Sequence, residues 1–129
     1  MRLDDFIGIP YVEKGRTLEG CDCWGLLVLV YDRYFKIKVP SFSDDYQGFA
    51  DREGVDLLLE QHRNEWVQVE SPHIGDGVFM ILQGRPHVGI YIGDDRILHT
   101  SKGFGSIIER TDSVRLRNRI QSFHRFQHE

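Results

Sequence analysis

The chain has 129 residues, of which 40% are hydrophobic, 12% aromatic and 28% charged, which fits one globular domain spanning residues 1–129 and excludes a disordered segment. A formal net charge of -4 without a basic block argues against nucleic acid as a partner, because proteins that bind phosphate backbones display clustered lysine and arginine. The nearest approach to a basic stripe is Arg115, Arg117 and Arg119, which are expected to decorate a solvated loop or strand face.

The first part of the chain predicts a loop followed by helices. Residues 6–20 are rich in glycine, proline and charge and predict an ordered loop. The apolar run from Cys23 to about Phe35 fits a buried helix or a buried strand, and its length favours the helix. Asp22 is placed to cap that helix. Residues 41–49 predict a loop, and residues 51–62 carry apolar side chains at the spacing of a second helix.

Short β-type runs separated by Gly, Pro and Asp turns follow. They cover residues 66–69, 77–82, 87–92, 96–100, 106–109 and 120–126. The link Gly93-Asp94-Asp95 is a strong hairpin signal, which would bring His87 and His99 onto neighbouring strands. Helices first and strands afterwards predict an α+β architecture, in which an N-terminal helix packs on a meandering antiparallel sheet.

The N-terminal sequence and the spacing of the cysteines bear on where the protein is located. Met1–Phe6 lacks the continuous apolar stretch of a secretory signal, and no window is long enough for a membrane span. We therefore expect synthesis in the cytoplasm without a signal peptide. Cys21 and Cys23 are separated by one residue, which is a poor framework for joining distant segments, so reduced thiols are expected.

Cys23 stands directly before the apolar run and is expected at the start of a buried helix. Backbone N–H groups and the helix dipole favour the thiolate there, and the thiolate is the form that attacks carbonyl carbons. The structural alternative is a buried thiol that acts as a small hydrophobic side chain. Cys21 lies in the same loop, where it would fill space or modulate its neighbour, and a redox pair of the two cysteines has weak support.

His87 and His99 are the polar groups that the predicted hairpin could gather beside Cys23. A nucleophile, a base and a third polar group would complete a cysteine hydrolase. Each histidine could instead contact only solvent or a backbone carbonyl. A zinc site formed by Cys21, Cys23, His87 and His99 has the right ligand types, but the one-residue spacing of the cysteines strains chelation of one metal, so we expect none.

Four motifs follow one another along the chain in the order found in a known protein family. Pro10-Tyr11-Val12 leads through a glycine-containing loop to Asp22-Cys23-Trp24-Gly25-Leu26, which is similar to the family's Asp-Cys-Ser-Gly-Leu motif. Ile74-Gly75-Asp76 resembles its Pro-Gly-Asp strand entry. His87-Val88-Gly89-Ile90-Tyr91 matches its His-x-Gly-Ile-Tyr strand, and His99 occupies the place of the third polar residue. Together these motifs resemble the NlpC-type cysteine peptidases that cut bacterial peptidoglycan, whose members carry a papain-like core, and the resemblance covers about Asp5 to Phe126.

The resemblance implies a Cys-His-His triad of Cys23, His87 and His99. Cys23 would attack a peptide carbonyl, His87 would carry the proton, and His99 would orient His87. Tyr11, Asp22 and Trp24 would lie at the oxyanion or substrate-binding site. The implied substrates are peptidoglycan stem peptides, cut at the bond that joins D-glutamate to a diamino acid, and no metal or organic cofactor is implied.

Two departures from the family pattern bear on where the protein acts. Trp24 replaces the usual Ser, and Glu13-Lys14 stands where many members have Trp-Gly, which resembles the branch associated with phage tails and gene-transfer particles. We therefore expect a phage or prophage tail-associated hydrolase that has tail proteins as partners and acts in the cell-wall compartment. The alternatives are a structural tail-tip assembly or plug protein that retains the fold, and an intracellular amidase or acyltransferase.

Overall fold

The structure is a computed structural model that describes residues 1–42 and 64–127. Its short helices are a 3-10 turn η1 (Leu3–Phe6), the α-helix α1 (Cys23–Val30) and a π-helical turn η2 (Tyr31–Phe35). The strands are β1 (Arg16–Thr17), β2 (Gly20–Cys21), β3 (Trp66–Val69), β4 (Gly77–Leu82), β5 (Arg85–Gly93), β6 (Arg96–Ser101), β7 (Gly105–Arg110) and β8 (Ile120–Phe126). The predicted helix at residues 51–62 and most of the loop at 41–49 lie outside the described residues.

The helix α1 begins where the sequence predicted, because Asp22 caps it. One carboxylate oxygen of Asp22 accepts the backbone N–H of Gly25 at 2.8 Å. Apolar side chains surround the helix, and all of its residues except Val28 are buried. The chain continues through η2 and leaves the helical path at Lys36, whose positive φ of 60° ends the run. The helical segment therefore spans the predicted residues 23–35.

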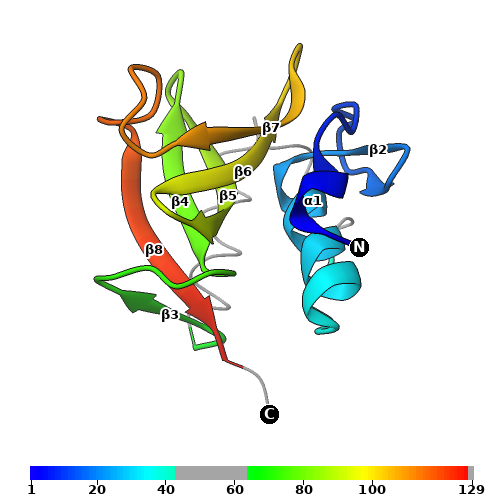
Figure 1. The fold of residues 1–129 in the computed structure, drawn as a ribbon, viewed down its shortest axis with the longest axis horizontal. Coiled ribbons are helices and arrows are strands. Elements are labelled where there is room, and N and C mark those ends of the chain that lie inside the picture. The colour runs from blue at the N-terminus through cyan, green and yellow to red at the C-terminus, as the bar shows by residue number, and fades with distance from the viewer. Residues whose placement is uncertain (43–63, 128–129) are drawn as a thin grey trace.

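The six-stranded sheet has the order β3-β8-β4-β5-β6-β7, and all of its neighbouring strands are antiparallel. Strands β4 to β7 form the predicted meander, and Asp94 and Asp95 turn the β5–β6 hairpin with φ values of 53° and 57°. Strand β8 lies outside this meander. This strand inserts between β3 and β4, so its partners are distant in sequence (Figure 1).

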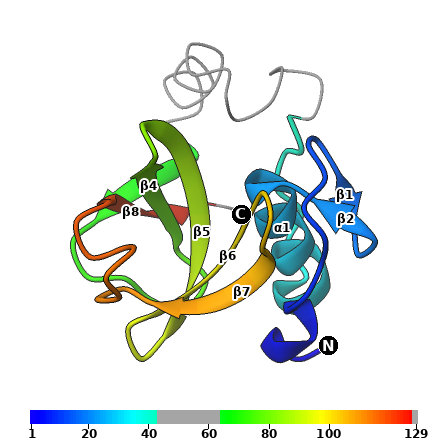
Figure 2. The ribbon, with the colours of Figure 1, turned by 90° about the horizontal axis from the view of Figure 1, so that it is seen from above.

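The sheet curves around α1, which packs against β5 and β6 on its inner face (Figure 2). Aromatic rings fill the space between the layers. The ring of Trp66 lies 5.7 Å from that of Trp24 and 5.0 Å from that of Phe126, measured between centroids. This helix on an antiparallel sheet is the α+β arrangement that the sequence predicted.

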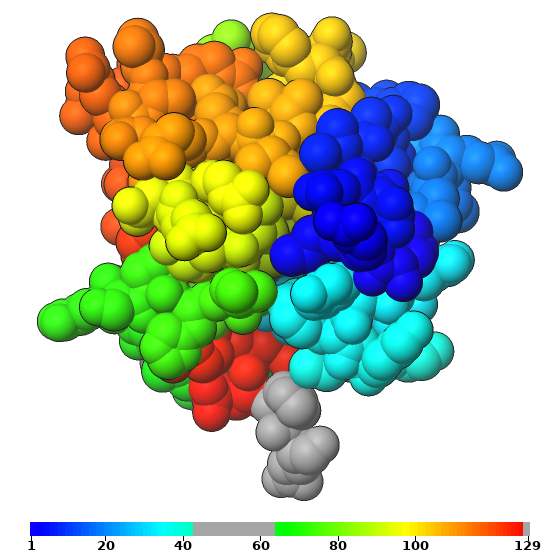
Figure 3. All heavy atoms as spheres, viewed as in Figure 1, coloured from blue at the N-terminus to red at the C-terminus, as the bar shows by residue number. Residues whose placement is uncertain are grey.

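The N-terminal segment is more structured than the predicted loop, because it holds η1 and the β1–β2 hairpin. Its residues also bind the outer edge of the sheet. Gly8 donates its N–H to the carbonyl of Ser106 on β7 at 2.9 Å, and Ser106 donates to the carbonyl of Ile9 at 3.0 Å. The segment, blue in Figure 3, therefore lies against β7, drawn in orange.

A second set of stabilising contacts lies far from these bonds, where β4 and β8 approach the helical segment. Asp76, in the turn before β4, accepts the backbone N–H of His73 at 2.7 Å, a bond typical of aspartate in turns. The guanidinium of Arg125 on β8 donates two bonds to the same carboxylate, at 2.9 and 2.8 Å. The Tyr31 hydroxyl donates to the neighbouring Gly75 carbonyl. These contacts fix β4 and β8 against the helical segment.

Candidate active site

Cys23 and His87 line the same cavity, whose volume is about 410 Å³. The cavity lies between the start of α1, the loop before β1, the β4–β5 and β6–β7 hairpins and the loop between β7 and β8. Its other lining residues are Tyr11, Glu13, Leu82, Gln83, Arg85, Pro86, Ser101, Lys102, Phe104, Val114, Arg115 and Arg119. The helix and the sheet therefore bring the predicted nucleophile and base to one site.

Cys23 is the first residue of α1 and is 1% exposed. The loop before the helix packs so closely that residue 25 has no room for a side chain. A Cβ atom at Gly25 would lie 2.1 Å from the carbonyl oxygen of Gly15. The Gly25 amide is bound by the Asp22 carboxylate. The amides of Cys23 and Trp24, which precede it, donate toward the thiol. The Val88 amide, next to His87, donates toward it from β5.

The structure corrects the expectation that the helix start makes Cys23 a ready thiolate. Burial raises the pKa of the Cys23 thiol, and the negative charge of Asp22 raises it further. The amides of Val88, Trp24 and Cys23 lower the pKa, but their effect is smaller. The resting side chain is therefore a neutral thiol, which needs a base to become a nucleophile.

A chain of hydrogen bonds links His87 to a carboxylate. His87 Nε2 and His99 Nδ1 are 2.9 Å apart, and His99 Nε2 lies 2.9 Å from Glu109 Oε1. His99 is fully buried between the other two side chains. His99 is thus adjacent to His87, as the sequence motifs predicted, and Glu109 extends the arrangement by one residue that the sequence analysis did not identify.

The carboxylate determines which nitrogen of each ring carries the proton. Glu109 can only accept, so His99 donates from Nε2 and accepts at Nδ1. His87 must therefore donate from Nε2 to His99. This leaves Nδ1 of His87 unprotonated, with a lone pair that can take the proton of Cys23.

Both histidines are neutral at rest. Burial lowers the pKa of His87 well below its usual range, and the neighbouring His99 and Arg115 lower it further. Burial also lowers the pKa of His99, although its bond to Glu109 opposes the change. A neutral imidazole and a neutral thiol that line one cavity suit general-base catalysis and not a preformed ion pair.

Tyr11 also lines the cavity, on the segment that pairs with β2 through Tyr11 and Cys21. Burial raises the pKa of the Tyr11 phenol, as do the nearby Cys23, Asp22 and Glu13. The hydroxyl therefore remains a hydrogen-bond donor at neutral pH. This is the form that an oxyanion requires.

The structure does not bring Asp22 and Trp24 into the cavity lining. The Asp22 side chain is fully buried and binds the amides of Lys14 and Gly25 and the guanidinium of Arg16. Trp24 points into the core, where its indole N–H donates to the Pro40 carbonyl at 2.9 Å. Both residues instead stabilise the start of the helix, Asp22 as its N-cap and Trp24 by packing in the core.

Cys21 is buried in β2, and burial raises the pKa of its thiol to about 12. Both cysteines are free thiols. Among residues 1–42 and 64–127, no group of three or more His, Cys, Asp and Glu side chains is arranged to hold a metal ion. In the same ranges, no helix is long and apolar enough to cross a membrane.

Comparison with known proteins assigns the fold to a family. Residues 8–125 match the sequence profile of the NlpC/P60 family. The chain belongs to the NlpC/P60 family. Members of this family are cysteine peptidases, which is the enzyme class that the sequence motifs predicted. The match contains all the residues of the hydrogen-bond chain and the nucleophile.

Curated relatives of this NlpC/P60 chain include two bacterial proteins. A probable endopeptidase NlpC homolog of Haemophilus influenzae is 25% identical over 109 residues, which are 84% of this chain and 51% of that protein. The murein DD-endopeptidase MepS/murein LD-carboxypeptidase of Escherichia coli K12 is 28% identical over 105 residues, or 81% of this chain and 48% of that protein. The chain spans about half the length of these relatives.

Solved NlpC/P60 structures share the fold. A family protein from Bacillus cereus has a TM-score of 0.65 and 25% identity, covering 94% of this chain and 36% of that chain. The NlpC/p60 domain of the peptidoglycan hydrolase SagA has a TM-score of 0.60 and 19% identity, covering 93% of this chain and 89% of that chain. The expected papain-like NlpC-type fold is confirmed.

Glu109 and Arg115 are site residues that were not predicted as such from the sequence. Arg115 donates to Glu109 at 3.2 Å and lines the cavity, so it is more than decoration of a solvated loop. A signal for Glu109 was present. Because β6 pairs His99 with Ile107, strand alternation places Glu109 on the same face as His99.

The lowered pKa values of the histidines predict acid sensitivity. Below about pH 6.5 the unfolded chain binds protons that the buried imidazoles do not, so the free energy of unfolding should fall as the pH decreases from 7 to 5. The slope per histidine is at most about 1.4 kcal/mol per pH unit. Urea unfolding should show a smaller loss for His87→Gln than for the wild type. The exposed His73→Gln control should keep the wild-type slope.

Glu109 is expected to act through the histidines. At pH 7, in a Cys21→Ala background, Glu109→Ala should slow alkylation of Cys23 by iodoacetamide about tenfold, because His87 then presents its Nδ1 lone pair less often. Glu109→Gln keeps an acceptor oxygen and should retain most of the rate. Mass spectrometry gives the rates, and melting temperatures identify misfolded variants. Equal rates for all three folded proteins would contradict this role.

Proposed function

We propose that this protein is an endopeptidase that cuts the stem peptides of peptidoglycan. The observation that carries the proposal is that Cys23 lines the same cavity as His87, whose unprotonated ring nitrogen is set by the bonds to His99 and Glu109. Family membership supports a cysteine peptidase mechanism. The names of relatives, which include an endopeptidase of murein and a peptidoglycan hydrolase, support the substrate.

The reaction begins when His87 Nδ1 takes the proton of the Cys23 thiol as the sulfur attacks the peptide carbonyl carbon. The imidazolium that forms donates a hydrogen bond from Nε2 to His99, and His99 in turn donates a hydrogen bond to the Glu109 carboxylate. The carboxylate therefore stabilises positive charge that exists only after proton transfer. Burial disfavours the charged pair before the substrate arrives, so the charge forms with the new carbon–sulfur bond.

The oxyanion of the tetrahedral intermediate needs donors near the thiol. The amides at the start of α1 and the Tyr11 hydroxyl are available there, and the raised pKa of Tyr11 keeps it a donor. His87 then gives its proton to the leaving amine, and a thioester forms on Cys23. Water, deprotonated by His87, hydrolyses the thioester and restores the thiol.

The bond we propose joins D-glutamate to the diamino acid of the stem peptide. The motifs around Cys23, His87 and His99 support this choice through their resemblance to the family. We further propose that the protein acts in the cell-wall compartment as part of a phage or prophage tail. Trp24 and Glu13-Lys14 support that location, because they depart from the usual family pattern toward the tail-associated branch.

Digestion of purified peptidoglycan tests the activity. The wild type and Cys21→Ala should release fragments whose masses show cleavage between D-glutamate and the diamino acid. Cys23→Ala should lower the rate by at least about a thousandfold, because it removes the nucleophile. Cleavage by Cys23→Ala at the wild-type rate would refute the mechanism, and products cut at another bond would refute the bond assignment.

Tail association has a separate test. An antibody against the chain should detect it in phage particles purified from the source strain after prophage induction. Its absence from particles that are present in quantity would overturn the proposed location. Particles that contain the chain and assemble equally well with Cys23→Ala, while neither protein cuts peptidoglycan, would favour the structural tail-tip alternative.

A further inference from the structure

The cavity around Cys23 has a charge opposite to that of the chain. Four of its lining side chains are cationic, namely Arg85, Lys102, Arg115 and Arg119, and we call these four the cationic rim. Glu13 is the carboxylate among the described lining residues. The whole chain has a formal net charge of -4. Positive charge is therefore concentrated at the mouth of the candidate active site.

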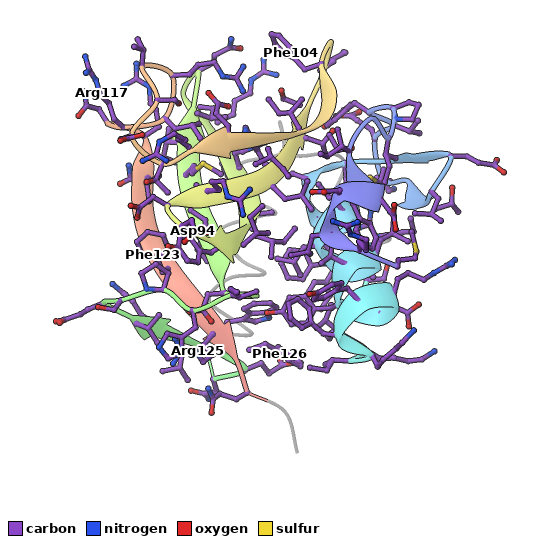
Figure 4. All side chains as sticks on the ribbon, viewed as in Figure 1. Asp94, Phe104, Arg117, Phe123, Arg125 and Phe126 are labelled. Carbon is purple, nitrogen blue, oxygen red and sulfur yellow. The ribbon has the colours of Figure 1, made fainter. Side chains whose placement is uncertain are left out.

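The cationic rim is assembled from three segments that are separate in the sequence. Arg85 begins β5, Lys102 lies in the β6–β7 hairpin, and Arg115 and Arg119 lie in the loop between β7 and β8. The tip of the β6–β7 hairpin also holds Phe104, which is 65% exposed and labelled in Figure 4. The fold, and not a local run of sequence, gathers these charges.

Three of the four cations differ from the fourth in their ion pairing. Among the residues that the structure describes, Arg85, Lys102 and Arg119 form no ion pair. Arg115 differs, since it donates to Glu109 at 3.2 Å and its guanidinium lies 5.0 Å from the centre of the Phe104 ring. The first three are therefore available to a ligand, whereas Arg115 is held in place by its neighbours.

Cations around a concave site attract anions, because the walls of the protein focus their field into the opening. Arginine suits carboxylates best, since its planar donors can bind both oxygens. A stem peptide offers such groups. A D-glutamyl residue keeps one carboxyl group outside the peptide chain, and a dicarboxylic diamino acid brings another close to the bond that would be cut.

We propose that the cationic rim binds the free carboxylates of the stem peptide, so that the preferred substrate class is the acidic, unamidated stem. This inference rests on the proposed function and adds a specificity to it. A stem whose glutamyl carboxyl is a carboxamide presents no charge at that position. It would leave cations of the rim without a partner, and it is the poorer substrate.

A matched pair of synthetic stem peptides tests the proposal. The two peptides are identical except that the side carboxyl of the D-glutamyl residue is free in one and amidated in the other. The wild type should cut the free acid with a kcat/KM at least about tenfold higher, since a charged hydrogen bond is lost with the amide. Added NaCl should reduce the preference, because salt screens exposed charges.

Variants of the cationic rim assign the effect to its residues. Arg85→Gln and Arg119→Gln should each reduce the preference severalfold, mainly through KM for the free acid. Arg117→Gln is the matched control. Arg117 lies in the same loop as Arg119, is exposed and does not line the cavity, so its replacement should leave the preference unchanged. A preference that survives in all the rim variants would overturn the proposal.

Failure of this proposal can be separated from failure of the proposed function. Equal cleavage of both peptides by the wild type would overturn the carboxylate preference and leave the peptidase assignment standing. If neither peptide is cut, calorimetric titration of each into Cys23→Ala measures binding alone. Tighter binding of the free acid that is lost in Arg119→Gln would support the rim, and equal binding of the two peptides would refute it.

Discussion

The geometry of the site depends on the carboxylate of Asp22. Its oxygens bind the Gly25 amide of the helix, the Lys14 amide of the preceding loop and the guanidinium of Arg16. This one buried group fixes both the first turn of α1 and the loop that covers it. The cost is electrostatic, because a negative charge beside Cys23 raises the pKa of the thiol that it positions. Burial is the larger cause of the raised pKa, and Asp22, the residue that positions Cys23, adds to it.

The raised pKa of Cys23 accounts for the roles of the two histidines and Glu109. A protonated thiol needs a base with a free lone pair, and the base needs a fixed tautomer. Glu109 fixes the tautomers, because a carboxylate can only accept and its bond to His99 therefore determines which nitrogen of each ring carries the proton. The same carboxylate accepts from Arg115 at the mouth of the cavity. The interior chain of imidazoles and the positive surface around the opening therefore meet at a single side chain.

The sequence predicted most of the elements, because their causes are local. The apolar run after Cys23, the capping Asp22 and the turn at Asp94 and Asp95 each specify structure within a few residues. The insertion of β8 between β3 and β4 could not be predicted in this way, since it results from packing between distant segments. The protonation of Cys23 was misjudged for a related reason. The helix start is visible in the sequence, whereas burial, the larger effect, arises only in the folded chain.

The neutral resting state of Cys23 also bears on chemical durability. Peroxides and disulfides react with thiolates far faster than with thiols, and oxidation of cysteine begins from the thiolate. In the proposed mechanism the buried thiol loses its proton only as the sulfur attacks a carbonyl, so the thiolate would exist for a small part of each turnover. The burial that makes a base necessary in that mechanism would thus also keep the sulfur reduced between substrates.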